Sequence, residues 1–312
     1  MMVLGSLPEG GGHRLTPRPP FETAGDVLAR AHRILWSRGP GAVVRRAWLG
    51  RARLSRCPVV LETGVEPAAA GGLREAAFHF APGALDSGLF EPDGAAALKA
   101  LAGQIADGLF VLDAPALQSE ALARIRPELY TAGLSGPLLR IAAAYLGLDC
   151  LYLGATLKRE VADGRAHGTR QWHLDIEDER FLRVLLYLSP VTRDAGPFQH
   201  LSAPLSAEVR QRLGYRIGYL NDEVLAKVAP PDRWQAVLGE AGDAMLFDGT
   251  RLFHRAQPPT ARERWSITFT YASRNPLELQ FSTRLSVASH RRLTATLPEE
   301  LRRCIPPPTL FW

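Results

Sequence analysis

The eight residues from Arg264 to Tyr271 alternate strictly between polar and bulky apolar side chains. Because successive side chains of a β-strand point to opposite faces, this segment predicts a strand with one polar and one apolar face. The pattern fits an ordinary amphipathic surface strand, and it equally fits a barrel or jelly roll whose polar face lines the interior. The polar face comprises Arg264, Ser266, Thr268 and Thr270, and the apolar face comprises Trp265, Ile267, Phe269 and Tyr271.

From residue 150 onward the chain is rich in segments of strand character, and helical patterns lie mainly before them. Apolar residues at helical spacing predict helices over 95–106, 117–128 and 137–145, the last ending at Gly147. A helical insertion is predicted at about 204–240, with helices over 206–213, 221–228 and 231–238. The fold class we expect is therefore mainly β with flanking helices. The predicted strands are 109–112, 150–159, 181–188, 198–201, 244–247 and 264–271.

The first 95 residues are predicted to form a partly helical, arginine-rich extension of one domain that spans 96–312. Residues 1–56 hold ten arginines against three acidic residues, in a chain of net charge +5. A solvated helical face, with helices over 22–36 and 42–49, explains this excess; the alternative is peripheral contact with a membrane or attraction of an anionic ligand. No nucleic-acid-binding motif accompanies the arginines, so we expect no nucleic-acid partner.

The sequence also indicates where the protein is located and how its cysteines are used. No apolar run reaches the roughly 20 residues of a transmembrane segment. The first residues are broken at Pro8, too early for a signal peptide, so we expect a cytoplasmic protein. Three cysteines at wide spacing, Cys57, Cys150 and Cys304, argue against a disulfide framework or a zinc ribbon.

His173 and Asp175 stand two positions apart in the strand-like run 171–175, so both side chains can point to one face of a sheet. A His-x-Asp pair alone is common by chance and is a weak signal. The best candidate for a third ligand is His254, which lies 81 positions later and close to the strand at 264–271. Two imidazoles and one carboxylate that converge in this way predict a facial metal site.

Such a ligand set suggests a specific chemistry. It leaves about three open positions on an octahedral iron(II) ion, which can take a bidentate 2-oxo acid and then dioxygen. The distal carboxylate of a dicarboxylic 2-oxo acid would pair with a buried arginine and a neighbouring hydroxyl. Arg264 and Ser266 supply both from one strand face, and Arg262, which shares their parity, is the reserve candidate.

Taken together, these residues resemble the iron(II)/2-oxoglutarate-dependent oxygenases, and their layout is similar to the phytanoyl-CoA dioxygenase-like family. The resemblance covers about residues 98–275 and is carried by the segments 106–111, 171–175, 196–200 and 241–248. It implies a double-stranded β-helix, which is a cupin-like jelly roll. It implies that His173, Asp175 and His254 bind Fe(II) and serve catalysis, and that Arg264 and Ser266 bind 2-oxoglutarate, with O2 as the other co-substrate. Lys158 and Thr169 lie where related enzymes contact 2-oxoglutarate.

The activity that the resemblance implies is hydroxylation of an unactivated C–H bond of a small-molecule or lipid- or sugar-type substrate. Asp175 argues against the halogenase variant, in which a small residue replaces the carboxylate. The segment His200–Pro204 departs from the family's usual Pro-Gly-Ser-His pattern, which concerns the loop on the substrate side. No motif identifies the substrate, although the arginines of 1–56 favour an anionic or membrane-proximal one.

Two other classes of function remain open. A cupin-type metal-dependent isomerase or hydrolase would use the same three ligands but would need neither 2-oxoglutarate nor Arg264. A non-catalytic binding protein with a degenerate barrel is the second, and the complete His/Asp/His set speaks against it. Binding of the co-substrate separates the first alternative from the oxygenase.

Overall fold

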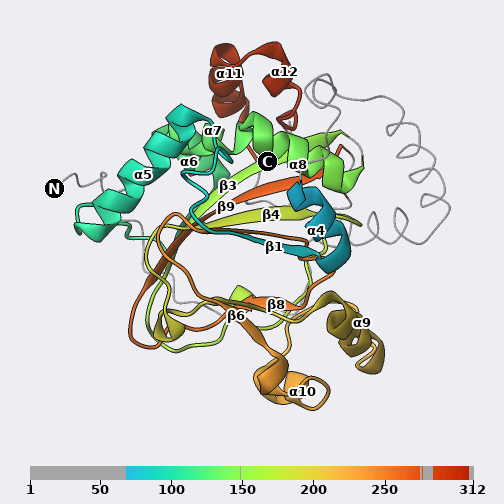
Figure 1. The fold of residues 1–312 in the computed structure, drawn as a ribbon. Coiled ribbons are helices and arrows are strands. Elements are labelled where there is room, and N and C mark those ends of the chain that lie inside the picture. The colour runs from blue at the N-terminus through green and yellow to red at the C-terminus, as the bar shows by residue number, and fades with distance from the viewer. Residues whose placement is uncertain (1–67, 148, 275, 277–283, 309–312) are drawn as a thin grey trace, which may run out of the picture.

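Two antiparallel sheets face each other in the computed structural model, which describes residues 68–147, 149–274, 276 and 284–308 (Figure 1). The large sheet has six strands in the order β1-β7-β4-β9-β3-β2, and the small sheet has three in the order β6-β5-β8. The large sheet contains β1 (Phe78–Ala81), β2 (Ala116–Leu117), β3 (Cys150–Glu160), β4 (Leu182–Tyr187), β7 (Ala244–Phe247) and β9 (Arg264–Ser273). The small sheet contains β5 (Phe198–His200), β6 (Gln235–Val237) and β8 (His254–Ala256).

The path of the chain between the sheets is that of a jelly roll. From β3 it crosses to the segment 171–175, returns to β4, and crosses again to β5 and β6. It then returns to β7, crosses to β8 and closes with β9. The segment 171–175 belongs to the small sheet because His173 forms an antiparallel bridge with His254, the first residue of β8. The expected double-stranded β-helix is therefore confirmed.

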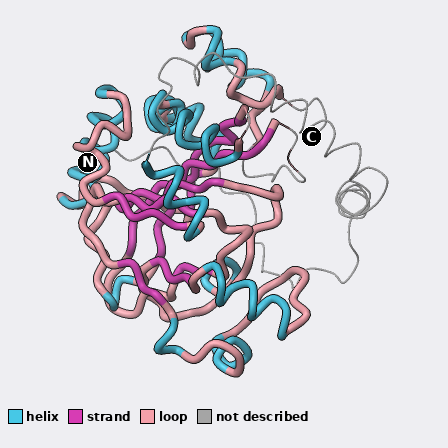
Figure 2. The backbone as a smooth tube through the Cα atoms, turned by 45° about the vertical axis from the view of Figure 1, so that its right-hand side comes forward, coloured by secondary structure: helices cyan, strands magenta, loops and turns pink. Residues whose placement is uncertain are grey.

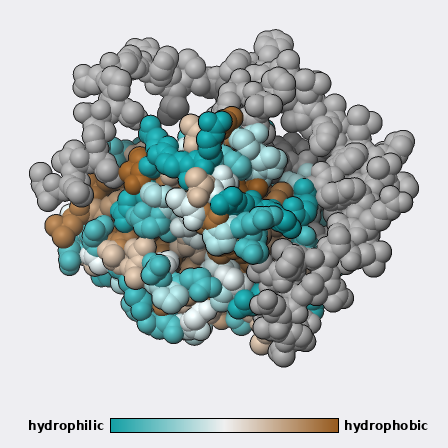
Figure 3. All heavy atoms as spheres, turned by 90° about the horizontal axis from the view of Figure 1, so that it is seen from above, coloured by the Kyte–Doolittle hydropathy of each residue, from teal (hydrophilic) through white to brown (hydrophobic). Residues whose placement is uncertain are grey.

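Helices cover the outer face of the large sheet, and others flank the small sheet (Figures 1 and 2). The helices over the large sheet cover the apolar face of β9: Ile267, Phe269 and Tyr271 are fully buried in the core between this sheet and the helices. Seen from this helical side, the surface is largely hydrophilic with scattered apolar side chains (Figure 3). The helices over the large sheet are α4 (Ala68–Ala76), α5 (Pro92–Ala106), α6 (Ser119–Ile125), α7 (Pro127–Thr131), α8 (Gly136–Leu146), α11 (Val287–Thr296) and α12 (Glu299–Arg302); those beside the small sheet are α9 (Ala203–Arg212) and α10 (Asp222–Ala226).

The sheet begins upstream of the domain boundary predicted at residue 96. Strand β1 pairs along its whole length with β7, in the register Phe78 to Phe247 and Ala81 to Ala244. Helix α4 precedes it and buries Leu73 in the main core. The described part of the first 95 residues is thus built into the sheet and its helical layer. The helices predicted over 22–36 and 42–49, and Cys57, lie outside the described residues.

Three local predictions are wrong for identifiable reasons. Residues 109–112 form no strand in the described structure: Leu109 and Val111 are more than half exposed, and the amides of residues 109 and 110 bond back to the carbonyl of Gln104 and not to a strand. The helix predicted over 231–238 is a short 3-10 turn followed by β6, because pairing with β5 overrides local propensity. The helix predicted over 117–128 is split into α6 and α7 at Pro127, which begins the second helix.

The described residues include no helix that is both long and apolar enough to span a membrane. Cys150 and Cys304 are buried in the main core.

Candidate metal centre

His173, Asp175 and His254 come together at the edge of the small sheet. His173 and His254 are bridge partners whose backbone amides and carbonyls exchange two hydrogen bonds of 3.1 Å, so their rings lie side by side with centroids 4.3 Å apart. Oδ1 of Asp175 lies 3.7 Å from Nε2 of His173 and 3.8 Å from Nε2 of His254. All three side chains are buried, and their ligand atoms lie within 4.8 Å of one another, a spacing at which they could hold one metal ion.

The hydrogen bonds of the two imidazoles orient them for metal binding. Nδ1–H of His173 donates to the carbonyl of Gln171, and Nδ1–H of His254 donates to the carbonyl of Leu252, both at 2.9 Å. Because a carbonyl can only accept, the proton of each neutral ring sits on Nδ1. The lone pair of each Nε2 is therefore left facing Asp175, which is the arrangement typical of histidines that ligate a metal.

Charge states at neutral pH also suit ligation. Burial lowers the pKa of His254 to about 3, and the neighbouring His173 adds to the effect. Burial likewise lowers the pKa of His173, although the Asp175 carboxylate opposes the shift. Burial alone would raise the pKa of Asp175, but the Arg183 guanidinium acts against it, and that pKa lies below its usual range. Both imidazoles are consequently neutral and the carboxylate is ionised.

A glycine makes this convergence sterically feasible. Gly249 lies so close to the cluster that a Cβ atom at this position would be 2.6 Å from Cγ of Asp175 and 2.9 Å from Cε1 of His254. Its carbonyl accepts a 2.8 Å hydrogen bond from the amide of Asp175. The turn that carries Gly249 is fixed by the buried Asp248, which accepts hydrogen bonds from the amide and hydroxyl of Thr250. The close approach of this turn to Asp175 therefore has no room for a side chain.

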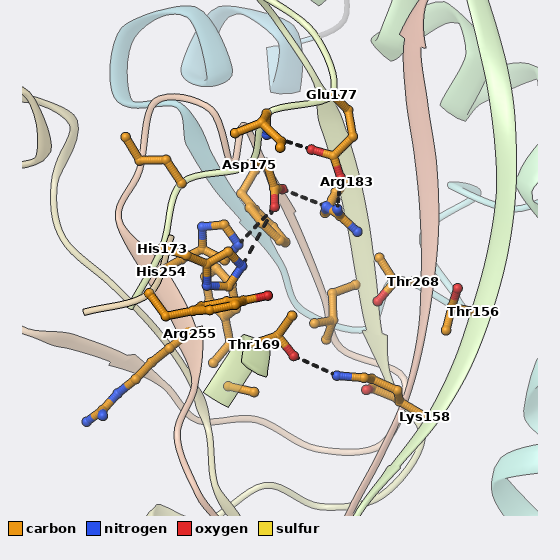
Figure 4. Close-up of a pocket in the computed structure, with 18 of the residues that line it drawn as sticks. Thr156, Lys158, Thr169, His173, Asp175, Glu177, Arg183, His254, Arg255 and Thr268 are labelled. Atoms are coloured by element: carbon orange, nitrogen blue, oxygen red, sulfur yellow. Dashed lines mark hydrogen bonds and ion pairs between the residues drawn. The ribbon is translucent and has the colours of Figure 1, made fainter. Parts of the chain in front are cut away.

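Residues adjacent in sequence to the two histidines, Trp172 before His173 and Arg255 after His254, form a support behind them. The guanidinium of Arg255, next to His254, lies over the rings of Trp172, next to His173, and of Trp234, at 4.7 and 5.3 Å from their centroids. Arg255 and the indole of Trp172 both donate to Asp222 at the start of α10. Arg255 points away from the metal ligands (Figure 4). This stack ties the segment 171–175 and β8 to the α10 region.

The three candidate ligands open into a cavity of about 440 Å³ between the sheets. In Figure 4 they converge at one end, while Lys158 and Thr169 meet at the other, with Thr156 and Thr268 on the wall formed by β3 and β9. The polar face of β9 thus lines an interior, as one of the two interpretations of its alternation predicted. Besides the three ligands, the lining includes Gln118, Thr156, Lys158, Thr169, Leu174, Ile176, Glu177, Arg183, Leu185, Phe198, Ile217, Tyr219, Phe247, Arg264, Ser266 and Thr268.

Arg264 is almost fully buried at the start of β9, where it lines this cavity. Its Nη1 donates to the carbonyl of Gly196, and its Nη2 lies 3.7 Å from Oε1 of Glu160. Among the described residues its buried Nε has no hydrogen-bond partner. The reserve candidate Arg262 lies elsewhere: its side chain is 68% exposed and faces Asp194.

Lys158 and Thr169 were predicted near the co-substrate, with an exposed Lys158 as the alternative, and the structure places both in the cavity wall. Nζ of Lys158 donates to Oγ1 of Thr169 at 2.9 Å and to Oε1 of Glu160 at 2.8 Å. Glu160 also pairs with Arg170 at 2.6 Å. Burial would raise the pKa of Glu160, but these cations lower it to about 2.

Three charged residues of this region were not identified from the sequence: Glu160, Glu177 and Arg183. Of the three, Arg183 could most readily have been identified from the sequence, because it is the only charge within the predicted strand 181–188. A charge isolated in an apolar strand faces either solvent or a functional interior. Glu160 and Glu177 carry no comparable local signal.

Comparison with known proteins finds partial likeness to solved structures. AviO1 from Streptomyces viridochromogenes Tue57 is 19% identical over 68% of this chain and 97% of its own, with a TM-score of 0.45. EctD from S. alaskensis, crystallised with 2-oxoglutarate and 5-hydroxyectoine, is 20% identical over 69% of this chain and 80% of its own, with a TM-score of 0.47. HygX from Streptomyces hygroscopicus, with nickel and 2-oxoglutarate bound, is 15% identical over 67% of this chain and 88% of its own, with a TM-score of 0.46. No protein-family model and no curated protein matches the sequence.

Proposed function

We propose that this protein is an iron(II)- and 2-oxoglutarate-dependent dioxygenase that hydroxylates an unactivated C–H bond of a small molecule. The observation that carries the proposal is the convergence of His173, Asp175 and His254 in one cavity whose opposite wall holds Arg264. Two neutral imidazoles and one ionised carboxylate are the facial ligand set of non-haem iron(II) oxygenases.

The residues present fit both groups that the activity requires. For the metal, the two Nε2 lone pairs and Oδ1 of Asp175 face one another, and each imidazole is held by a carbonyl on its other nitrogen. For the dicarboxylate, Arg264 offers a buried Nε–H that no described residue uses, and the hydroxyl of Ser266 lies on the same strand face.

The charge balance around Arg264 also favours an anion. Three cations, Lys158, Arg170 and Arg264, share two carboxylates, Glu160 and Asp163, so one positive charge is in excess. A carboxylate that reaches this buried region would gain charge-assisted hydrogen bonds, which are stronger than neutral ones. We assign Arg264 and Ser266 to the distal carboxylate of 2-oxoglutarate, and Lys158 with Thr169 to the same end of the cavity.

When bound, iron(II) would supply the activation of dioxygen, coupled to oxidative decarboxylation of 2-oxoglutarate. The protein itself holds the metal and the co-substrate and keeps water away from them. His173, Asp175 and His254 hold the metal, Arg264 sets the direction of the co-substrate, and the apolar side chains Leu185, Phe198 and Phe247 keep water from the reacting end of the cavity.

The substrate would enter beside the loop between α9 and α10. Ile217 and Tyr219 are 59% and 52% exposed, yet both line the cavity, and the Tyr219 ring meets the His173 ring edge-on at 5.3 Å. This apolar rim next to a metal ligand supports a substrate of small-molecule, lipid or sugar type with an apolar face. Residues 1–56, for which membrane or anion contact was an alternative, lie outside the described structure.

One observation favours the second candidate, a cupin-type isomerase or hydrolase that does not use 2-oxoglutarate. Arg264 already donates to the Gly196 carbonyl and faces Glu160, so part of its charge and one of its donors are satisfied within the protein. In that case Arg264 would be a structural residue, and only the metal ligands would matter for activity.

The deciding experiment is an anaerobic titration of iron(II)-loaded protein with 2-oxoglutarate, followed by the visible charge-transfer band of a chelated 2-oxo acid. We expect a band in the wild type, a weaker one in Arg264→Ala and an unchanged one in the matched control Arg262→Ala, whose guanidinium is exposed. A folded, metal-loaded wild type that shows no band would reject the oxygenase and favour the cupin-type enzyme.

A further inference from the structure

The two oxygens of the Asp175 carboxylate face different partners. Oδ1 is the atom that lies 3.7 and 3.8 Å from the Nε2 atoms of the two histidines. Oδ2 accepts a 2.7 Å hydrogen bond from Nε of Arg183. One oxygen is therefore turned to the metal position, and the other is occupied by a cation (Figure 4).

Arg183 is itself held firmly in this position. It lies on β4, which pairs with β7 on one side and β9 on the other. Its Nη2 donates to Oε1 of Glu177 at 2.7 Å, and its guanidinium lies over the ring of Phe181 at 5.0 Å from the centroid. Glu177 is in turn almost fully buried and accepts from the amide of Ile176. A guanidinium with two carboxylate partners and a ring beneath it has little freedom to move.

Gly249 also closes on Asp175. The backbone of this residue approaches so closely that a Cβ would fall 2.6 Å from Cγ of Asp175, and its carbonyl binds the Asp175 amide. The atom nearest to that Cβ position is Oδ2, so the Gly249 backbone and the Arg183 guanidinium both confine this oxygen. The carboxylate cannot rotate to offer Oδ2 to the histidine side without breaking the bond to Arg183.

We propose that Arg183 is a positioning residue that keeps Asp175 to one ligating oxygen and offsets its charge, so that the metal retains room and affinity for a chelating anion. The inference rests on the metal site of the proposed function. Without Arg183, Oδ2 would compete for a coordination position, and the uncompensated carboxylate would repel a chelating dianion. The expected signature is a loss of chelator affinity that is larger than any loss of metal affinity.

The test uses the full-length protein with Mn(II) as the metal and oxalate as the probe, both measured by calorimetry. Oxalate chelates metal through two oxygens and carries no further carboxylate for Arg264 to bind. For Arg183→Met we expect oxalate affinity to fall about tenfold or more, the scale typical of partners that orient metal ligands, while Mn(II) affinity stays within about tenfold of wild type. Arg183→Lys, which restores the charge without the planar fork, should recover only part of the oxalate affinity.

Arg159→Met is the matched control, because Arg159 also pairs with a carboxylate, Glu263, but faces away from the cavity lining. It should leave both affinities unchanged. Unchanged oxalate affinity in metal-loaded Arg183→Met would overturn the inference. So would a folded Arg183→Met protein that no longer binds Mn(II), since Arg183 would then only be needed to build the site.

If Arg183→Met does not fold, the wild type still decides. The infrared difference between metal-free and Mn(II)-loaded protein should show the widely separated carboxylate stretches of one-oxygen ligation, and narrowly separated stretches would overturn the inference. A wild type that binds Mn(II) and oxalate but not 2-oxoglutarate would refute the proposed function and leave the role of Arg183 standing.

Discussion

Replacing Gly249 by alanine tests whether the geometry of the metal cluster depends on one missing side chain. The backbone of Gly249 is not in the left-handed region, so alanine can adopt it without conformational strain. The only obstacle is space: real Cβ atoms essentially never approach other atoms within 3.0 Å, and here Cβ would lie 2.6 Å from Cγ of Asp175. Cγ must therefore withdraw by at least about 0.4 Å, and the nearer Oδ2 by more.

The withdrawal required of Oδ2 is larger than the roughly 0.5 Å within which a metal site must hold its ligand groups, and a shift of about 1 Å can cost about a hundredfold. We expect Gly249→Ala to lower Mn(II) affinity by about a hundredfold, or about 2.8 kcal/mol. The free energy of unfolding of the metal-free protein should fall by about 1–3 kcal/mol, the usual cost of overpacking.

Metal affinity is measured by titration followed with electron paramagnetic resonance, and stability by urea unfolding. Gly103→Ala is the matched control: this residue lies in α5, and apart from its chain neighbours and the backbone of its own helix, no heavy atom of the described residues comes within 4 Å of its Cβ position. It should bind metal normally and gain up to about 1 kcal/mol of stability. Wild-type metal affinity in Gly249→Ala would refute the geometric reasoning for the site.

Three further outcomes are expected. The pKa of His200 is lowered by burial to about 4 from 6.5, so the unfolded state binds more protons between these values, and stability falls as the pH drops from about 6.5 to about 4. The free energy of unfolding of the metal-free protein, measured in urea, should therefore change with pH less steeply in His200→Gln than in the wild type, by up to about 1.36 kcal/mol per pH unit, because one titrating group is removed. An unchanged slope would contradict the assignment. Lys158→Met should weaken 2-oxoglutarate binding to the iron(II)-loaded protein about tenfold by removing the excess positive charge, with Mn(II) affinity unchanged; equal loss of both would show a structural role instead. Gly133→Ala, whose Cβ would lie 2.5 to 2.6 Å from ring atoms of Tyr152, should reduce stability by about 1–3 kcal/mol without affecting Mn(II) affinity, and unimpaired thermal stability would show that the ring can yield.

The parts of the site that could be predicted from the sequence are those with a period or a motif. The alternation over Arg264–Tyr271 predicted a two-faced strand, and the structure places its polar face inside the barrel and its apolar face under the helices. The His173-x-Asp175 pair and His254 were found because ligand chemistry restricts the residue types. Their meeting required only that two strands lie side by side, which a jelly roll provides.

The contacts that the sequence could not predict are those set by how strands distant in the sequence pair and pack. Arg183 reaches Asp175 only because β4 lies where the chain returns from the segment 171–175, and Gly249 matters only because its turn presses on that same carboxylate. The helix wrongly expected at 231–238 fails for the same reason, since pairing with β5 decides its conformation. Helices α11 and α12 were not predicted, and α11 is docked through Ser286 and Ser289 onto Glu120, a contact across more than 160 residues.

In the proposed function, the two tasks of the cavity, metal binding and co-substrate binding, are divided between the sheets. The candidate metal ligands come from short pieces of the small sheet, while Arg264, Ser266 and Lys158 come from the long strands β3 and β9 of the large one. This proposal makes the barrel modular: we expect substitutions among the candidate ligands of the small sheet to change mainly which metal is accepted, and substitutions in β3 and β9 to change mainly which acid is accepted. A protein built in this way can acquire a new metal or a new co-substrate one step at a time.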